Sequence, residues 1–171
     1  MCSRTNVLKI LSSDDPTITL LSLPGYTKMW ADDVLGPTLL VKVDDNVVSK
    51  PTAEVLSGKK FVLFYFSAHW CMPCRKFTPL LSVTYEDLED KSEVEVVFVS
   101  ADEDKGGFDE YYGEMPWAAV PFVFEKREDI GEKYGVSGIP RCVVLNAQDG
   151  TVVNGDARAK IVAEKKLGGI F

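Results

Sequence analysis

The pattern of hydrophobic positions changes near residue 58 of this 171-residue chain. After that point two predominantly apolar runs, Phe61–Phe66 and Val94–Ser100, have the length and the aromatic and β-branched content of strands buried on both faces. Between these runs, side chains recur at helical spacing at Phe77, Leu80, Leu81, Thr84 and Leu88. The pattern therefore predicts a βαβ unit with parallel strands and a right-handed crossover.

Shorter elements are expected after this unit. In chain order they are a short helix over Phe108–Tyr112, a short strand over Phe122–Phe124, a helix over Lys126–Tyr134, an antiparallel hairpin of Cys142–Asn146 and Thr151–Asn154, and a closing helix over Ala157–Leu167. The predicted fold class is α/β, with a central mixed sheet flanked by helices on both faces. We expect residues 58–171 to form one compact unit.

Residues 1–57 precede this unit and are interpreted as an N-terminal extension. Their pattern predicts an apolar segment at Ile18–Leu23, a short helix over Tyr26–Leu35, and a β-hairpin with strands Leu39–Val43 and Val47–Val48. We expect the extension to pack on the main unit and cover one edge of its sheet, because open edges invite pairing with other chains.

Composition and charge narrow the functional classes. The formal net charge of −7 disfavours general binding to nucleic acid or to anionic membranes. No apolar run approaches the length of about 18 residues needed to span a bilayer, and the first residues lack the apolar core of a secretory signal. We expect a cytoplasmic monomer; Arg4 and Lys9 make only a weak mitochondrial case, which Asp14 and Asp15 oppose.

Two cysteines stand directly before the predicted helix, in the segment Trp70-Cys71-Met72-Pro73-Cys74. Residues three apart in a first helical turn share one face, near enough for their sulfurs to bridge. Cys71 would lie at the helix N-terminus, where unpaired N–H groups and the dipole favour negative charge and lower the pKa of such a thiol from about 8.5 to about 7. Pro73 fits the first turn, where its missing N–H costs no hydrogen bond. The spacing therefore indicates a redox dithiol.

The cysteine pair has two other interpretations. A zinc site needs four ligands, usually from a second Cys or His pair, but the chain otherwise offers only Cys2, His69 and Cys142. An inert structural disulfide is unusual in a chain without other paired cysteines or a secretory signal. The pattern favours a catalytic dithiol with no metal and no bound cofactor, apart from the redox-active disulfide Cys71–Cys74.

Four segments carry a resemblance to a known family. They read FYFSAHWCMPCRKFTP (64–79), VVFVSADED (96–104), EMPWAAVPF (114–122) and YGVSGIPRCVVLNAQDGTVV (134–153). In this order they resemble the thioredoxin fold, and within it the nucleoredoxin and tryparedoxin branch. The resemblance covers about residues 58–160.

The resemblance implies roles for matching positions. Cys71 would be the attacking nucleophile, and Cys74 would resolve the mixed disulfide. Trp70 would pack beside the dithiol and shape substrate access. Pro140 matches the cis-proline of the family, which would expose the backbone of Ile139 for strand-like pairing with a substrate.

Other matching positions concern the surroundings of the dithiol. Tyr65 takes the place where simple thioredoxins bury a carboxylate, so proton handling must differ, through a water or through Glu103. Trp117 is either a core aromatic or part of the substrate-binding lip, and Arg158 is expected in the active-site surroundings. His69 either tunes the thiolate or points to solvent, and Cys142 is expected to be buried and inert.

The chain departs from the tryparedoxin pattern at Met72, Ala101, Arg141 and Asp156. Arg141 follows the cis-proline where a threonine is usual, and it could supply positive charge that Asp156 removes. The acidic run Asp102–Asp104 is expected to be a solvated turn. These departures affect which electron donor and which client protein the chain would use, more than the thiol–disulfide exchange itself.

Two functions follow from the resemblance. The first is a thiol–disulfide oxidoreductase that takes electrons from trypanothione, glutathione or a reductase and reduces protein disulfides, such as those of peroxiredoxin-type peroxidases. The second is a redox-regulated binding module like nucleoredoxin, with little turnover, which holds a partner and releases it when Cys71 is oxidised.

Overall fold

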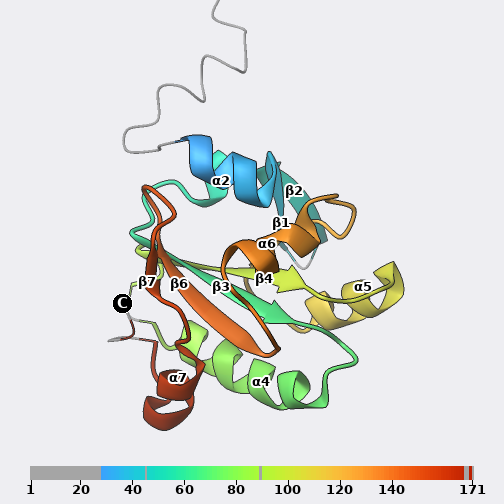
Figure 1. Cartoon of the computed structure of the whole chain (residues 1–171), viewed down its shortest axis with the longest axis vertical. Coiled ribbons are helices and arrows are strands. Elements are labelled where there is room, and N and C mark those ends of the chain that lie inside the picture. Colours follow the sequence, from blue (N-terminus) through green and yellow to red (C-terminus); the bar gives the residue numbers. More distant parts are fainter. Residues whose placement is uncertain (1–27, 45, 89, 168–169, 171) are drawn as a thin grey trace, which may run out of the picture.

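The structure of the chain is a computed structural model. It describes residues 28–171 apart from residues 45, 89, 168, 169 and 171, so the predicted segment Ile18–Leu23 lies outside the described residues. Figure 1 shows a central twisted sheet with helices on both of its faces. Among the described residues, no helix combines the length and apolar character needed to cross a membrane.

The sheet has seven strands in the order β2-β1-β5-β4-β3-β6-β7. Their bounds are β1 Thr38–Val43, β2 Asn46–Pro51, β3 Phe61–Ser67, β4 Val94–Ser100, β5 Ala118–Ala119, β6 Arg141–Asn146 and β7 Val152–Asn154. Strand β3 pairs in parallel with β4 and antiparallel with β6, and β6 pairs antiparallel with β7. The predicted βαβ unit, terminal hairpin and mixed sheet are therefore confirmed.

Six described helices cover the two faces of the sheet. Their bounds are α2 Lys28–Leu35, α3 Thr52–Val55, α4 Met72–Glu86, α5 Lys105–Gly113, α6 Arg127–Lys133 and α7 Arg158–Glu164. One buried cluster joins the sheet to α4, α5 and α7, and a second joins it to α2 and α6. Neighbouring residues of β3 show why the strand is apolar throughout: Tyr65 belongs to the first cluster and Phe64 to the second.

One local prediction needs correction, and one short helix was missed. The short strand is not at Phe122–Phe124 but at Ala118–Ala119, where small side chains fit between β1 and β4. Pro121 has no N–H to continue the strand, and the Phe124 N–H instead closes a turn on the Pro121 carbonyl at 3.0 Å. The short helix Thr52–Val55 was not predicted, because four residues give too little periodicity.

The N-terminal hairpin continues the main sheet at one edge. Leu40 of β1 lies opposite Ala119 of β5, and the Tyr112 hydroxyl donates to the Leu40 carbonyl at 3.0 Å. At the other end of the sheet, the Trp30 indole donates to the Ala147 carbonyl at 3.0 Å. The extension therefore covers a sheet edge, while the ability of residues 58–171 to fold alone stays a prediction.

The packing of Trp30 predicts a specific effect of substitution at Gly150. Gly150 has a φ of +72°, and a Cβ there would lie 2.5 Å from the Trp30 ring. We expect Gly150→Ala to lower the free energy of unfolding by about 3 kcal/mol, from backbone strain and overpacking together. Gly58 is a matched control, because its φ is +76° with nothing within 4 Å of the added atom. Gly58→Ala should cost about 1 kcal/mol in urea unfolding; equal costs would contradict the contact with Trp30.

Candidate active site

The two cysteines lie at the start of α4, directly after the loop that follows β3. Cys71 is the N-cap of α4, and its sulfur accepts the Cys74 N–H at 3.3 Å. The two sulfurs form a disulfide, with 5.2 Å between the Cα atoms. Cys71 keeps 5% of its surface exposed, whereas Cys74 is fully buried. Pro73 lies in the first turn, as expected. The more exposed cysteine is therefore also the one that caps the helix.

A second loop approaches the disulfide from the start of β6. The Ile139–Pro140 peptide bond is cis, as the resemblance implied. The Ile139 carbonyl oxygen lies 3.9 Å from the Cys71 sulfur, and the Ile139 side chain packs against the cluster of Ala68, Cys71 and Cys74. This places backbone hydrogen-bonding groups beside the reactive sulfur.

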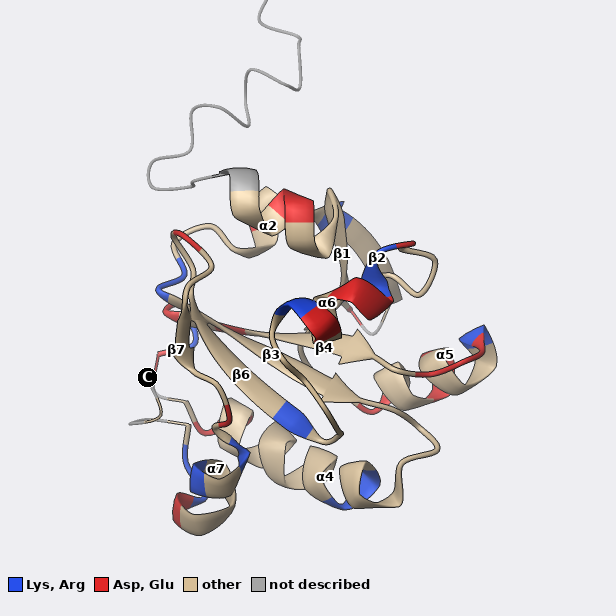
Figure 2. Cartoon of the chain, viewed as in Figure 1, with Lys and Arg blue, Asp and Glu red and all other residues tan. Residues whose placement is uncertain are grey.

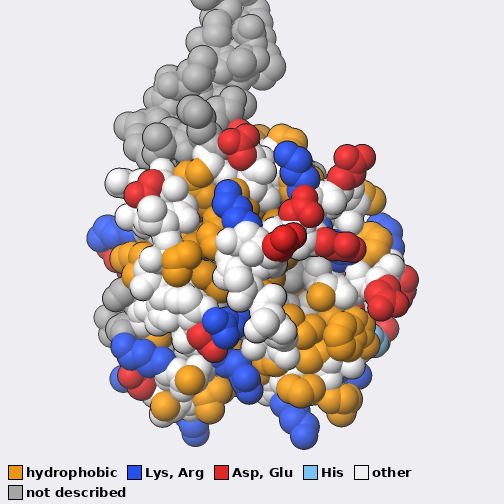
Figure 3. All heavy atoms as spheres, in the orientation of Figure 1, with side chains coloured by type: hydrophobic (Ala, Val, Ile, Leu, Met, Phe, Trp, Pro, Cys, Tyr) orange, Lys and Arg blue, Asp and Glu red, His pale blue; other side chains and the backbone are white. Residues whose placement is uncertain are grey.

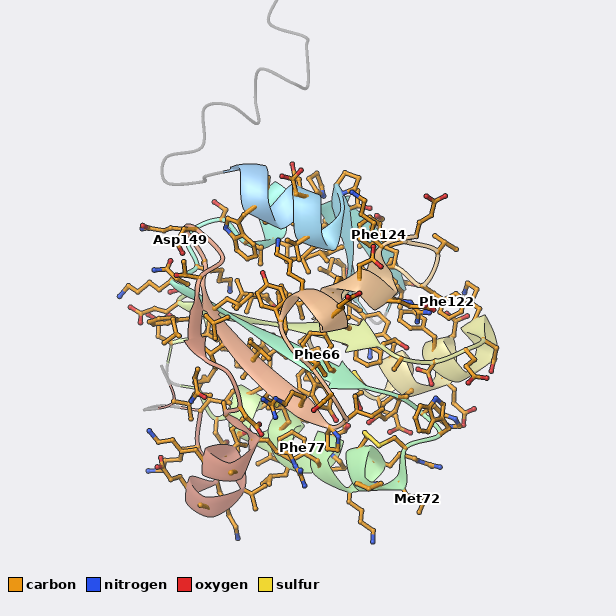
Figure 4. The ribbon with its side chains drawn as sticks, in the orientation of Figure 1. Phe66, Met72, Phe77, Phe122, Phe124 and Asp149 are labelled. Atoms are coloured by element: carbon orange, nitrogen blue, oxygen red, sulfur yellow. A yellow bond between two sulfur atoms is a disulfide. The ribbon has the colours of Figure 1, made fainter. Side chains whose placement is uncertain are left out.

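An apolar surface surrounds the disulfide. Trp70 and Met72 are each 61% exposed, and Figure 3 shows hydrophobic side chains gathered on this side of the molecule. Figure 4 shows Met72 at the outer end of α4, pointing away from the body, while Phe77 turns toward the sheet. Beside Trp70 lies a cavity of about 300 Å³, whose walls include Phe66, Trp70, Val99, Ala101, Val136 and Ile139. Such exposed apolar surface is typical of an interaction site.

Asp102 is buried, which corrects the prediction that the acidic run is a solvated turn. Only 2% of its surface is exposed. Its carboxylate accepts hydrogen bonds from the backbone N–H of His69 and from the Ser100 hydroxyl, each at 2.7 Å. Two N–H groups of Arg127 in α6 donate to the Asp102 carbonyl, each at 3.1 Å. Asp102 therefore ties α6 and the end of β4 to the loop that carries Cys71.

The other members of the acidic run are exposed. The Asp104 carboxylate accepts the Gly107 N–H at 2.9 Å and caps α5. Glu103 lies at the surface. His69 is partly buried, and its ring lies 3.5 Å from the Glu110 carboxylate, so the ring faces α5.

Tyr65 lies beneath the first turn of α4, as the resemblance implied. Its hydroxyl contacts the hydroxyls of Ser67 and Thr78 at 2.9 and 2.8 Å. Burial raises the pKa of Tyr65 far above its usual value, so the hydroxyl stays neutral at physiological pH. The position that holds a carboxylate in simple thioredoxins holds neutral hydroxyls in this chain.

Trp117 is a core aromatic, which is one of the two alternatives that the sequence left open, and it does not line the exposed surface around the disulfide. It is 2% exposed, and its ring packs edge-on against Tyr65 and Tyr85. The residue lies in the bend directly before β5, and its bulk fills the core. Its link to the site is the ring contact with Tyr65.

The two charged departures from the tryparedoxin pattern contact each other. Arg141 Nε donates to the Gly155 carbonyl at 2.9 Å, and its guanidinium lies 3.2 Å from the Asp156 carboxylate. Asp156 also accepts the backbone N–H of Arg158 at 3.1 Å. The charge of Arg141 is thus partly neutralised within the chain, and the structure gives Arg158 no contact with the disulfide.

Cys142 is buried and apart from the dithiol. It lies opposite Tyr65 in the β3–β6 pairing and has no exposed surface. Burial raises the pKa of its thiol well above the usual range, which keeps it protonated and unreactive.

Charges are distributed unevenly around the disulfide. Figure 2 marks basic positions near the start of α4, and both acidic and basic positions along α6 and α7. Arg75 and Lys76 are exposed in the first turns of α4, where they add positive charge to the helix N-terminus. Among the residues that the structure describes, no group of three or more His, Cys, Asp or Glu side chains is placed to hold a metal ion.

The fold and the dithiol define the class of protein. The thioredoxin-like family profile matches residues 58–152, and the chain belongs to this family. Within the family, it is 40% identical to a tryparedoxin from Trypanosoma brucei brucei over 70% of this chain and 85% of the relative. It is also 41% identical to a nucleoredoxin from Mus musculus over 89% of this chain and 33% of the relative.

Solved structures place the chain in the same branch. Native tryparedoxin I from Crithidia fasciculata superposes with a TM-score of 0.71 at 37% identity, covering 81% of this chain and 94% of that one. A tryparedoxin II complexed with glutathionylspermidine superposes with a TM-score of 0.67 at 35% identity, covering 76% and 90%. The chain spans nearly the whole of the tryparedoxins, but only about a fifth to a third of the nucleoredoxins that it matches.

Sequence reasoning missed the residues that support the site from other elements. Asp102 was visible only as part of an acidic run, although its place directly after a buried strand was a usable signal. Thr78 lies four residues after Cys74 on the same helical face, and Ser67 is the polar end of an apolar strand. Tyr111 gave no local signal, because nothing in the sequence shows that α5 approaches α4.

The buried carboxylate predicts a measurable cost of substitution. Asp102→Ala leaves the His69 N–H and the Ser100 hydroxyl without their acceptor, so we expect the free energy of unfolding to fall by about 2 kcal/mol. The His69 amide should also exchange faster in hydrogen-exchange NMR. Glu103→Ala is the control, because the neighbouring carboxylate is exposed and its loss should change stability by less than about 0.5 kcal/mol. Two variants of equal stability and equal His69 exchange would exclude this role.

Proposed function

We propose that the chain is a thiol–disulfide oxidoreductase that reduces protein disulfides through Cys71 and Cys74. The observation that carries the proposal is the position of Cys71, whose sulfur caps α4 and lies 3.9 Å from the Ile139 carbonyl. A sulfur at a helix N-terminus is stabilised as a thiolate. An extended client segment pairing with the Ile139 backbone would bring its own disulfide to that sulfur.

The reaction would follow thiol–disulfide exchange. The Cys71 thiolate attacks one sulfur of the client disulfide, that S–S bond breaks, and the other client sulfur leaves as a thiolate. Cys74 then loses its proton and attacks the Cys71 sulfur, which releases the second client thiolate and closes the Cys71–Cys74 disulfide. The client gains two electrons, and two donor thiols restore the dithiol while forming their own disulfide.

Peroxiredoxin-type peroxidases are the proposed clients, and a small thiol such as trypanothione or glutathione, or a reductase, is the proposed donor. Support comes from the relatives: the chain spans nearly the full length of tryparedoxins, and one of them was solved with glutathionylspermidine, a thiol compound. The exposed apolar surface formed by Trp70 and Met72 suits contact with a protein client.

A redox-regulated binding module is the second candidate. It is supported by the same exposed surface and by the identity of 41% to a nucleoredoxin. In this case the chain would hold a partner on the surface around Trp70 and Ile139 and turn over slowly. Both functions use Cys71 and both involve binding of a partner. The rate of disulfide reduction therefore distinguishes them, because only the oxidoreductase turns over rapidly.

The oxidoreductase proposal predicts rapid turnover with one donor. The oxidised protein is mixed with trypanothione, glutathione or thioredoxin reductase, each with its recycling system, and reduction of insulin disulfides is followed. One donor should support catalysis, and Cys71→Ser should lower the rate about a thousandfold or more. Cys74→Ser should stop turnover but trap the client on Cys71.

A result without turnover would also discriminate between the two functions. If none of the three donors drives reduction although Cys71 and Cys74 oxidise reversibly, the oxidoreductase proposal is wrong. A partner bound to the reduced protein and released on oxidation would then support the binding module.

The chemical identity of the nucleophile can be tested by pH-dependent alkylation. In a Cys2→Ser background, the reduced native protein should react with iodoacetamide at Cys71, with a rate that rises through a midpoint near pH 7, about 1.5 pH units below an ordinary thiol. Cys142 should stay unmodified until the protein is unfolded, because its raised pKa keeps the buried thiol protonated. Peptide mapping by mass spectrometry identifies the site; a midpoint near 8.5 would show that the helix does not activate Cys71.

A further inference from the structure

Four buried hydroxyl groups meet beneath the first turn of α4. They come from three elements, β3, α4 and α5, and belong to Tyr65, Ser67, Thr78 and Tyr111. Each of the four residues is at most 1% exposed. A cluster of neutral hydroxyls in a core costs free energy unless every group is paired, so its internal contacts matter.

The four hydroxyls form a closed ring. The oxygen of Tyr65 lies 2.8 Å from that of Thr78 and 2.9 Å from that of Ser67. The Tyr111 oxygen lies 2.9 Å from that of Ser67 and is also hydrogen-bonded to Thr78. The Tyr65 and Tyr111 oxygens also lie 3.5 Å from each other, across the ring. Each hydroxyl therefore contacts at least two others, and the ring connects β3 to both helices.

The ring also reaches the resolving cysteine. Thr78 donates to the Cys74 carbonyl at 3.1 Å, and the Tyr65 hydroxyl lies 3.5 Å from the same oxygen. The Cys74 carbonyl is only a few covalent bonds from the Cys74 sulfur. A change in the orientation of these hydroxyls therefore changes the electrostatic potential at that sulfur.

The number of protons does not match the number of contacts. Each of the four hydroxyls has one proton to donate. They make seven contacts, five between hydroxyls and two with the Cys74 carbonyl, so at least three contacts lack a proton of their own at any moment. Rotation of the O–H bonds can change which contacts carry a proton without moving the heavy atoms.

The proposed reaction requires a buried thiolate, which reorienting hydroxyls could stabilise. Cys74 is fully buried, and burial disfavours the thiolate that must form before it attacks the mixed disulfide. Among the described residues, the hydrogen bonds of the ring go to hydroxyls and to the Cys74 carbonyl, and none goes to a carboxylate. Because burial raises the pKa of Tyr65, its hydroxyl does not ionise. The ring can respond to a negative charge on the Cys74 sulfur only by reorienting its O–H dipoles.

We propose that the hydroxyl ring stabilises the Cys74 thiolate during resolution, by turning its O–H dipoles as negative charge develops on the sulfur. Its members act through the carbonyl and the local potential and do not touch the reacting sulfurs, so they are positioning residues. The inference rests on the proposed dithiol function and assigns the ring to its second step only.

The α5 helix offers a matched pair of variants. Tyr111→Phe removes one member of the ring. Tyr112→Phe removes the neighbouring buried hydroxyl, which donates to the carbonyls of Leu40 and Trp117 and lies outside the ring. Both changes remove a single oxygen from a fully buried tyrosine of one helix, so a general loss of packing affects them alike.

The two steps can be separated with Ellman's reagent in the Cys2→Ser background. Attack by Cys71 releases one thionitrobenzoate and leaves a mixed disulfide; attack by Cys74 on that disulfide releases the second. In stopped-flow absorbance, Tyr111→Phe should slow the second release about tenfold and leave the first within twofold. That factor corresponds to about 1.4 kcal/mol, the size of one hydrogen bond toward a charge. The pH midpoint of the second phase should also rise.

The other variants complete the test. Tyr112→Phe should leave both phases within twofold, and Thr78→Val, which removes the donor to the Cys74 carbonyl, should slow the second phase at least as much as Tyr111→Phe. An unchanged second phase in both ring variants, or equal slowing of both phases, overturns the role of the ring. A wild-type protein that releases only one thionitrobenzoate, like Cys74→Ser, would instead contradict the dithiol function itself.

Discussion

The first turn of α4 is the constraint on which the rest of the site depends. Its N-cap is the Cys71 sulfur, which accepts the Cys74 N–H at 3.3 Å. An acceptor at this position satisfies one of the unpaired donors of the helix, and a negatively charged acceptor does so more strongly. The same geometry that begins the helix therefore favours the reactive form of the sulfur. Anything that holds this turn in place also tunes the chemistry.

The topology of the sheet holds the turn from several directions. Because β3 and β4 are parallel, their C-terminal ends reach the same edge of the sheet, and the antiparallel β6 starts there. The loop with Cys71, the loop with Asp102 and the cis-proline loop thus meet at one point, although they are far apart in the sequence. Asp102 fastens the first of these loops to the second, and Ile139 closes against Cys71 from the third. These two contacts hold the three loops in fixed positions relative to one another.

The predictable part of this arrangement is the part encoded locally. The buried strand, the helix and the cysteine spacing between them are consecutive in the chain, so periodicity and capping rules were sufficient. The supporting contacts are different, because Asp102 meets His69 across 33 positions and Tyr111 meets Ser67 across 44. A polar residue at a strand end is ambiguous until the partner strand is known, which is why Asp102 was expected in solvent. The choice between a core and a lip position for Trp117 was left open for the same reason: its neighbours Tyr65 and Tyr85 come from other elements.

Arg141 and Asp156 both depart from the tryparedoxin pattern, and they form an ion pair with each other. Considered singly, Arg141 adds a cation after the cis-proline and Asp156 adds an anion near the same edge. In the structure, the guanidinium is held by the Gly155 carbonyl and the Asp156 carboxylate. Both side chains are partly exposed, so the pair contributes little to stability. Its effect is on the surface, where each charge is partly neutralised by the other. Under the proposed function, recognition of a client would therefore depend more on the apolar surface around Trp70 and on backbone pairing at Ile139 than on a fixed charge beside Pro140.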